Sequence, residues 1–338
     1  MQQRAKNIVT IGGGTGSFTL LSGLKKYPAH EIDITAIVTM ADNGGSTGRL
    51  RDEFGFLPVG DVRMALAALS DTDDRELLRE LFLYRFNKGA GLSGHNFGNL
   101  FLVALTDVLG SEEKAIEYAG KILRIRGRVL PVTGENTNLV AKYSDGTIIK
   151  GESSIDEPSF DHVSEKQIEK VYLEPRVSTT SNVQKAIEHA DIIVLGPGDL
   201  YTSTIPNLLA EGVSESLQKT SAKIVYVVNL MTKFGQTSGY TAQTFVDTIS
   251  KYIGRVPDLV VINNTPLPKE VFPLYEAEYE FPVKDDLKES GGFKIVRDNL
   301  LSQVVVKKSS SDKLKRSLIR HDPDALSRVV IRLLNEKK

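Results

Sequence analysis

The sequence predicts an α/β protein: a mostly parallel β-sheet with helices on both faces and a small antiparallel β insert. Short continuous apolar runs alternate with segments of helical periodicity, which is the pattern of repeated βα units. Several of these runs end in glycine-rich loops. Residues 127–175 break the alternation with strand-like segments and little helical spacing. We therefore expect one domain over residues 1–338, with a β-rich insert at 127–175.

In the first third of the chain, residues 7–11 and 34–40 are expected to be buried strands, because each is a short apolar run. Apolar residues spaced three and four positions apart predict the helices that accompany them. The expected helices lie at 18–27, 61–69, 73–86, 96–109 and 111–124.

Beyond residue 127, the sequence Tyr-Ser-Asp-Gly-Thr at 143–147 predicts a hairpin turn within the insert. Strands and helices then alternate again, and Asp322 followed by Pro323 predicts the start of the last helix. The expected strands are 191–195, 224–229 and 259–263, and the expected helices are 183–190, 241–253 and the segment after Pro323.

Composition excludes several classes of protein and site. The 338 residues carry 42 Lys and Arg against 43 Asp and Glu, so nothing general attracts nucleic acid or an anionic membrane. The absence of cysteine excludes disulfides, thiolate catalysis and cysteine-ligated metals, and suits a reducing compartment. The longest apolar run, residues 100–105, is too short for a membrane span. We expect a cytoplasmic protein with no membrane span and no nucleic-acid partner.

The placement of glycine gives the first lead to a function. Fifteen of the 28 glycines fall within four short windows, at 12–16, 44–60, 89–98 and 196–198. Three windows lie at or after expected strand ends, and strand ends of a parallel sheet share the edge where ligands bind. Backbone N–H groups and hydroxyls in such loops hold phosphate. We expect these loops to converge on a phosphate or nucleotide, although a turn without a ligand also explains the first loop.

The first loop matches the dinucleotide-binding fingerprint only in part. In the pattern G-x-G-x-x-G, Gly12 and Gly14 match, but Ser17 stands at the third place. The acid expected about 20 residues further on is missing, because the first acid after the second strand is Asp42. NAD is therefore the weaker nucleotide hypothesis. The segment 42–51 is expected to be an anion-binding loop, a flap that closes over the ligand, or simply a flexible loop.

Two aspartates indicate a cation. Asp42 ends the second strand and Asp61 opens a helix, and carboxylates that face phosphates are typical ligands of Mg²⁺. Asp61 is equally explained as a plain helix cap. Among the nearby arginines, Arg63 rather than Arg49 or Arg51 is expected to neutralise a diphosphate.

Residues 93–99 place three polar side chains at the start of an apolar helix. Asn96 and Asn99 are expected to donate to a base or sugar, and His95 is either a structural residue or a ligand contact. His321, beside the cap of the last helix, is expected to be structural.

Six sequence strings, and a seventh near the C-terminus, carry a family resemblance. The strings are IGGGTGSF (11–18), ADNGGSTGRLRDEF (41–54), PVGDVRM (58–64), SGHNFGNL (93–100), LGPGDLYTST (195–204), NLMTK (229–233) and RHD (320–322). They resemble the YvcK proteins of the CofD-like superfamily, the gluconeogenesis factors, run in that family's order and cover most of the chain.

This resemblance implies a Rossmann-like three-layer α/β/α sandwich and binding of UDP-sugars, UDP-N-acetylglucosamine in particular. It implies a cytoplasmic regulatory role in cell shape and wall-precursor balance during gluconeogenic growth, with a protein partner. No established reaction belongs to this branch. We also expect a homo-oligomer.

The sister branch, the CofD transferases, resembles this chain at the first glycine loop, at Asp42, at Asp61 and in the GPG segment. Those enzymes join 2-phospho-lactate to a deazaflavin with Mg²⁺. This chain departs from them, since Asn43 follows Asp42 where they favour a second aspartate, and Asp-Leu-Tyr follows GPG where they favour Ser-Asn-Pro. A Mg²⁺-dependent transferase is therefore the alternative function, and a regulatory protein is the leading one.

The expected mechanism is ligand sensing, in which loops 12–17 and 196–204 hold a diphosphate and the segment near Asn229 meets the uridine or sugar. Asp42 and Asp61 are the expected metal ligands, and Mg²⁺ is optional rather than required. The residues expected to bind the nucleotide are Gly12, Gly13, Gly14, Thr15, Gly16, Ser17, Asn43, Gly44, Gly45, Ser46, Arg63, His95, Asn96, Asn99, Gly196, Pro197, Gly198, Asp199, Tyr201, Thr202, Ser203, Asn229 and Thr232.

Overall fold

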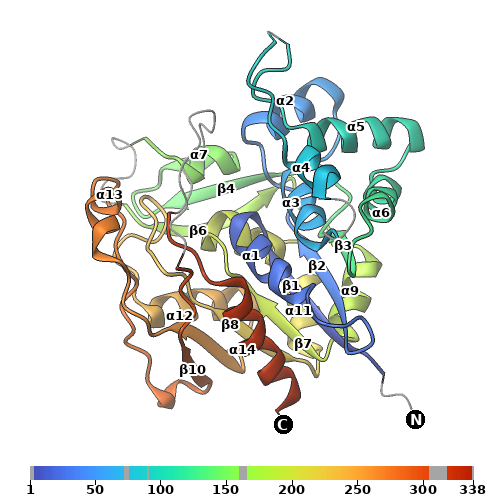
Figure 1. The fold of residues 1–338 in the computed structure, drawn as a ribbon. Coiled ribbons are helices and arrows are strands. Elements are labelled where there is room, and N and C mark those ends of the chain that lie inside the picture. Colours follow the sequence, from blue (N-terminus) through green and yellow to red (C-terminus); the bar gives the residue numbers. More distant parts are fainter. Residues whose placement is uncertain (1–3, 72–75, 90, 160–165, 304–317, 337–338) are drawn as a thin grey trace.

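The computed structural model describes residues 4–71, 76–89, 91–159, 166–303 and 318–336. Its main sheet has seven strands in the order β10-β9-β8-β7-β1-β2-β3, each parallel to its neighbours. Helices cover both faces of this sheet (Figure 1), which confirms the predicted three-layer α/β/α architecture. The strands are β1 (Lys6–Gly12), β2 (Ile32–Val38), β3 (Arg128–Pro131), β7 (Ile192–Leu195), β8 (Lys223–Val227), β9 (Leu259–Asn263) and β10 (Lys294–Asp298).

Most of these strands have continuous apolar sequences because both faces of each strand are buried. Along β1, Ile8 packs into one core, whereas Val9 and Ile11 pack into the other. The core around Ile8 lies under α1 (Gly14–Leu24), α3 (Gly60–Leu69), α6 (Glu112–Leu123) and α14 (Pro323–Asn335). The opposite core lies under α9 (Ser181–Glu188), α10 (Ile205–Leu208), α11 (Val213–Lys219) and α12 (Ala242–Ile253).

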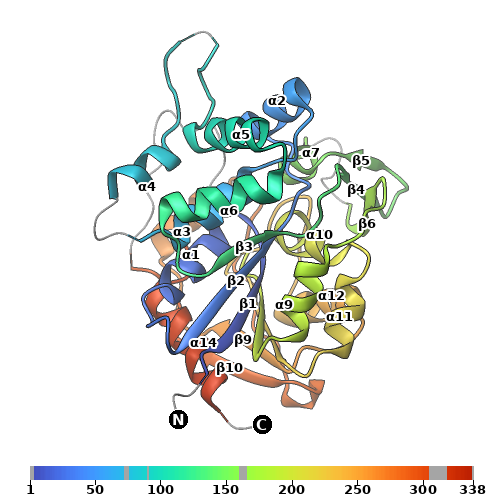
Figure 2. The ribbon, with the colours of Figure 1, turned by 90° about the vertical axis from the view of Figure 1, so that its right-hand side faces the viewer.

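A small antiparallel sheet, with strand order β5-β4-β6, lies within the predicted insert. Its strands are β4 (Asn138–Tyr143), β5 (Ile148–Lys150) and β6 (Ile168–Glu174), and the short helix α7 (Glu152–Asp156) follows β5. The predicted hairpin turn joins β4 to β5. β3, at the start of the 127–175 segment, belongs instead to the main sheet. Figure 2 shows the small sheet and α7 beside the upper end of the main sheet.

One difference from the prediction concerns segment 42–51. The structure has a helix there, α2 (Gly45–Phe54), in place of the expected loop or flap. Four of its residues are buried, and Gly55 ends it in the left-handed conformation with φ 72°. Three glycines at 44–48 concealed this helix, because glycine weakens helix propensity in sequence patterns.

Another difference is β10, which the sequence did not indicate. It is an edge strand with a mixed polar pattern, so it lacks the apolar run that identified the others. The remaining helices are α4 (Glu76–Leu83), α5 (Phe97–Leu109) and α13 (Phe272–Glu276). None of the helices in the described ranges has the length and apolarity that a bilayer crossing requires. The extent of a single domain over 1–338 stays a prediction, for which one cooperative unfolding transition is the expected result.

The strand order creates a ligand-binding position. From β1 the chain proceeds to β2 and β3 on one side, and β7 to β10 follow on the other. The loops after β1 and β7 therefore leave the sheet in opposite directions, and a crevice forms between them at the carboxyl edge. The start of β1 and the end of α14 lie at the opposite end of the molecule, away from α2 and α7 (Figure 1).

Candidate nucleotide-binding site

A cavity of about 910 Å³ lies at this carboxyl edge, and we call it the switch-point cavity. The loops after β1, β2, β7 and β8 line it, together with α7 and with residues from 85–94 and 319–321. Its volume is in the range of small-molecule sites. The predicted residues that line it are Gly13, Gly14, Thr15, Gly16, Asp42, Gly44, Gly45, Ser46, Asp61, Arg63, Asn99, Pro197, Gly198, Asp199, Thr202, Ser203, Asn229 and Thr232.

The first glycine loop is packed so tightly that a side chain would not fit at Gly13 or at Gly16. A Cβ on Gly13 would lie 2.1 Å from Asp61 Oδ2, and a Cβ on Gly16 would lie 2.2 Å from the carbonyl oxygen of Pro197. The backbone N–H of Gly14, the first residue of α1, donates to Asp61 Oδ1 at 2.8 Å. Glycine at 13 and 16 thus lets the β1 loop contact both α3 and the β7 loop.

Asp42 and Asp61 lie at adjacent parts of the cavity wall. Asp42 Oδ1 accepts from the backbone N–H of Gly44 at 2.8 Å. Burial raises the pKa of Asp42, and burial together with the charge of Asp42 raises the pKa of Asp61 to about 7. The charge of Arg63 opposes both increases. Two negative groups are therefore held in a place that disfavours their charge, which a cation would relieve.

The same wall contains a third carboxylate that the sequence did not indicate. Glu152, the first residue of α7, lines the cavity. Burial and the charges of Asp42 and Asp156 raise its pKa well above the usual value. No group of three or more His, Asp and Glu side chains in the described chain is arranged to hold a metal ion. A divalent cation here would therefore need ligands from the bound molecule besides Asp42 and Asp61.

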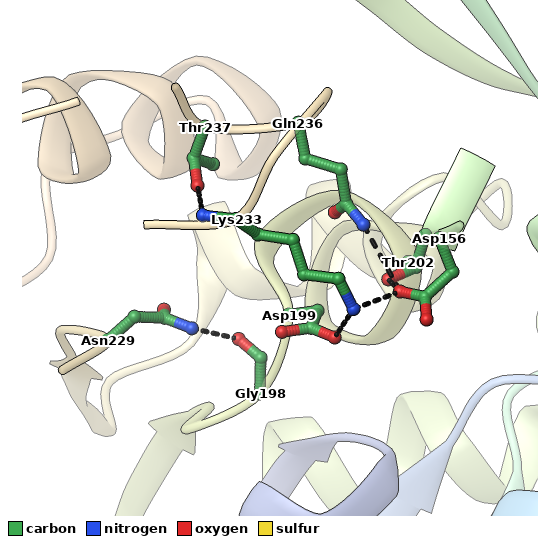
Figure 3. A network of polar contacts seen from close by, with 8 residues as sticks. All are labelled: Asp156, Gly198, Asp199, Thr202, Asn229, Lys233, Gln236 and Thr237. Carbon is green, nitrogen blue, oxygen red and sulfur yellow. Dashed lines mark hydrogen bonds and ion pairs between the residues drawn. The ribbon is translucent and has the colours of Figure 1, made fainter. Parts of the chain in front are cut away.

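A lysine joins two further carboxylates on the β7–β8 side, as Figure 3 shows. Lys233 Nζ lies 2.8 Å from Asp156 Oδ1 and 3.0 Å from Asp199 Oδ2. Asp156 Oδ1 also accepts from Thr202 Oγ1 and from Gln236 Nε2, both at 3.1 Å. These contacts join α7, the β7 loop and the β8 loop into one network.

Burial alone would lower the pKa of Lys233, but the carboxylates of Asp199 and Asp156 raise it above its usual value. Lys233 therefore stays charged at neutral pH. Asn229 lies in the same part of the cavity, and its Nδ2 donates to the carbonyl oxygen of Gly198 at 2.8 Å (Figure 3). This bond ties the β8 loop to the β7 loop.

Comparison with known proteins identifies the family. The family model described as 2-phospho-L-lactate transferase CofD matches residues 8–301. This chain belongs to the CofD family. It is 39% identical to the gluconeogenesis factor of Bacillus subtilis, over 99% of this chain and 100% of that protein. It is 40% identical to the gluconeogenesis factor of Halalkalibacterium halodurans, over 96% of this chain and 99% of that protein.

A crystal structure of a Bacillus halodurans protein superposes on this chain with a TM-score of 0.86 at 38% identity, covering 97% of this chain and 100% of that chain. A second crystal structure, with the same TM-score and identity, is described as a member of the UPF0052 family. The predicted membership of the YvcK branch of CofD-like proteins is confirmed.

Several predicted site residues of this CofD-family chain stand behind the cavity wall. Ser46, which lines the cavity, is the centre of a buried cluster of hydrogen bonds. Its Oγ contacts His95 Nδ1 at 3.2 Å, and it accepts from the backbone N–H of Asn96 at 3.2 Å and from Asn99 Nδ2 at 3.3 Å. Arg63 Nε donates to Asn99 Oδ1 at 2.9 Å. His95 and Asn96 thus support the cavity wall from behind. The sequence left His95 open between a structural role and a ligand contact, and it predicted a ligand contact for Asn96.

The remaining predicted residues that do not line the cavity hold its loops in place. Asn43 Oδ1 accepts from the backbone N–H of Ser153 at 2.9 Å, which ties the β2 loop to α7. The Tyr201 hydroxyl lies 2.8 Å from that of Tyr240, in the core. Gly12, Ser17 and Gly196 are buried where β1 and β7 end. Local sequence could not separate these from cavity residues, because both kinds occupy the same motifs.

Sequence reasoning did not indicate Arg85, Met231 or Ile319 as cavity residues, and it left Arg49 and His321 out of the ligand-binding set. Arg49 on α2 and Arg85 line one part of the cavity, and Met231, Ile319, Arg320 and His321 line another. His321 was expected to be structural, and whether it also contacts a ligand stays a prediction: it lines the cavity, it is 7% exposed, and burial lowers its pKa to about 4. Lys233 ends the motif at 229–233 and could have been found there.

Proposed function

We propose that this protein binds a UDP-sugar, UDP-N-acetylglucosamine in particular, in the switch-point cavity, and that binding serves regulation rather than catalysis. The observation that carries this proposal is the convergence of four strand-end loops on one cavity of about 910 Å³. The similarity to gluconeogenesis factors supports it.

In this arrangement the diphosphate lies between the β1 loop and the β7 loop. Thr15 and Gly16, at the start of α1, supply backbone N–H groups, and Ser203 supplies a hydroxyl. Arg63 adds positive charge behind Asp42 and Asp61. The uracil base takes the end near Met231, Ile319 and His321, where a small apolar cluster supports the wall.

Asp42 and Asp61 suit Mg²⁺, which proteins commonly bind with one or two carboxylates plus substrate phosphates. Their raised pKa values reflect charge that a cation would stabilise. Bound Mg²⁺ would supply charge neutralisation for the diphosphate. The chain's own contribution is to orient both carboxylates through the N–H groups of Gly44 and Gly14.

Isothermal titration calorimetry tests the proposal with UDP-N-acetylglucosamine, UDP and NAD, each with and without Mg²⁺. We expect UDP-N-acetylglucosamine to bind more tightly than NAD, and we expect Mg²⁺ to strengthen binding. Failure of every UDP-sugar to bind at millimolar concentration would refute the proposal. Tighter binding of NAD would favour the dinucleotide alternative.

A Mg²⁺-dependent transferase is the second candidate. It is favoured by the family match to the phospho-lactate transferase model and by the buried Asp42–Asp61 pair. Incubation with Mg²⁺ and nucleotide-activated donors tests it, with product detection by mass spectrometry. Turnover that disappears in Asp42→Asn and in Asp61→Asn would establish the transferase. Binding without product supports the regulatory proposal.

At the level of the cell, we propose a cytoplasmic role in cell shape and wall-precursor balance during gluconeogenic growth. Ligand binding would act through a protein partner, and the protein would form a homo-oligomer. Light scattering with and without UDP-N-acetylglucosamine measures the oligomer. Pull-down from cells grown on a gluconeogenic carbon source, with and without the ligand, tests for the partner.

A further inference from the structure

Two arginines from different elements line the end of the switch-point cavity at α2. Arg49 lies on α2, and Arg85 lies between α4 and α5. Both line the cavity, as do Asn87 and Ser93. This end is therefore basic and polar. Met231, Ile319 and Arg320 line a different part of the cavity.

Backbone carbonyls of one turn position both guanidinium groups. Arg49 Nη2 donates to the carbonyl oxygen of Ser93 at 3.2 Å, and Arg85 Nη1 donates to that of Gly94 at 2.9 Å. The turn itself is fixed, because the N–H of Gly94 donates to the carbonyl of Phe86 at 2.8 Å. The two guanidinium groups are thus held by the carbonyl groups of adjacent residues. Because these side chains are already ordered, an anion that binds them would lose less free energy in ordering them.

The charge of this end is visible at His95, which lies behind the same wall. Burial lowers the pKa of His95, and the positive charges of Arg49 and Arg85 lower it further. Glu53 is the carboxylate that opposes them. Among the residues that the structure describes, none of the carboxylates forms an ion pair with Arg49. The potential at this end therefore favours an anion.

We propose that Arg49 and Arg85 form an anion subsite, which takes a carboxylate or phosphate group at the α2 end of the cavity. Arginine suits this task because its planar fork matches the oxygens of both groups. The subsite rests on the proposed function, since it shares the cavity with the nucleotide. A base at the Met231–Ile319 end places the sugar of a nucleotide-sugar toward α2.

The anion has two possible sources. It is either a carboxylate on the sugar itself, as in UDP-glucuronate, or a separate small anion that binds beside a neutral UDP-sugar. Calorimetry with UDP-glucose and UDP-glucuronate distinguishes them, because these ligands differ only in the charged group. A third titration adds inorganic phosphate to protein saturated with UDP-glucose.

The test compares wild type with the double variant Arg49→Gln/Arg85→Gln. For a sugar carboxylate, we expect wild type to bind UDP-glucuronate about 10-fold more tightly than UDP-glucose, and the double variant to lose this preference. For a separate anion, we expect phosphate binding in wild type and an about 10-fold loss in the double variant. Arg328→Gln, an exposed arginine on α14, is the matched control for loss of charge.

Thermal unfolding of each variant excludes a folding defect, and Arg49→Gln alone provides a milder variant on an exposed position. If the double variant behaves like wild type in all three titrations, the subsite is refuted. If no UDP-sugar binds at all, phosphate titration of the free protein still tests the two arginines, so failure of the proposed function is distinguishable from failure of the subsite.

Discussion

Two pairs of acidic side chains face the same cavity, and they are stabilised in different ways. Asp42 and Asp61 each accept a hydrogen bond from a glycine backbone N–H at 2.8 Å. Asp156 and Asp199 instead lie on either side of Lys233, within 2.8 and 3.0 Å of its ammonium nitrogen. The first pair is positioned by backbone dipoles, whereas the second has a full positive charge between its members.

This difference indicates that one pair belongs to a binding site and that the other pair holds the cavity together. The Asp156–Lys233–Asp199 network joins three chain segments, and its ammonium group offsets one of the two carboxylate charges, so we assign it to holding the cavity together. Burial raises the pKa of Asp61 to about 7, and Asp42 adds to this effect. Because burial and mutual repulsion disfavour the charges of Asp42 and Asp61, this pair suits a cation that binds together with the ligand. Acidic residues that line one cavity thus have two roles, cation binding and structural support. The groups that contact them, backbone N–H groups or a lysine, distinguish the two roles.

The largest expected effect is that of Lys233→Met. The two carboxylates remain in a mostly buried position without their cation, so the free energy of unfolding should fall by about 3 kcal/mol. Urea unfolding measures it. Adding Asp156→Asn should restore part of the loss. Lys121→Met is the control, because Lys121 and its partner Glu117 are about 60% exposed; an equal loss in both variants would contradict the assignment.

Next in size is the effect of Asp42→Asn combined with Asp61→Asn. UDP-N-acetylglucosamine affinity in Mg²⁺ should fall about 100-fold, equivalent to about 2.7 kcal/mol, because the cation loses both carboxylates. Treating wild type with EDTA should produce the same loss. Unfolding stability should not fall, since the variant removes two buried charges. Asp52→Asn, at a side chain that is 79% exposed, is the calorimetric control; an unchanged affinity in the double variant would remove the metal from the proposal.

A smaller effect is expected from Asn43→Ala, beside the first pair. It removes the bond between Asn43 Oδ1 and the backbone N–H of Ser153, leaving the start of α7 less well held. The expected loss of stability is about 1 kcal/mol. Asn136→Ala removes an exposed bond of similar kind, to the carbonyl of Gly55, and serves as the control. A loss larger than that of Lys233→Met would show that α7 is held mainly from the side of the first pair.

The smallest effect is expected from Tyr201→Phe, two positions after Asp199. Loss of the 2.8 Å contact with the Tyr240 hydroxyl should cost about 0.5 kcal/mol of stability. UDP-sugar affinity should stay unchanged, because Tyr201 does not line the cavity. Reduced affinity at unchanged stability would return Tyr201 to the ligand-binding residues.

Much of the fold and part of the site followed from local sequence. The strands β1, β2 and β7 were predictable because burial on both faces requires continuous apolar residues. The hairpin at 143–147 and the Asp322 cap were predictable from turn and cap chemistry, and the structure has both. The glycine windows and Asp61 indicated the cavity edge, since parallel strands end there. Edge strand β10 and helix α2 were not predicted, because β10 lacks the apolar pattern typical of a strand and α2 lacks the apolar pattern typical of a helix.

The sequence by itself determined the fold class, the family and which loops border the cavity. Only the tertiary structure decided which side chains meet there. Lys233 and Asp156 are 77 residues apart, and Arg49 and Arg85 lie on different elements. Periodicity and turn chemistry act between neighbours in the chain, whereas these contacts depend on crossover connections that bring distant loops to one edge of the sheet.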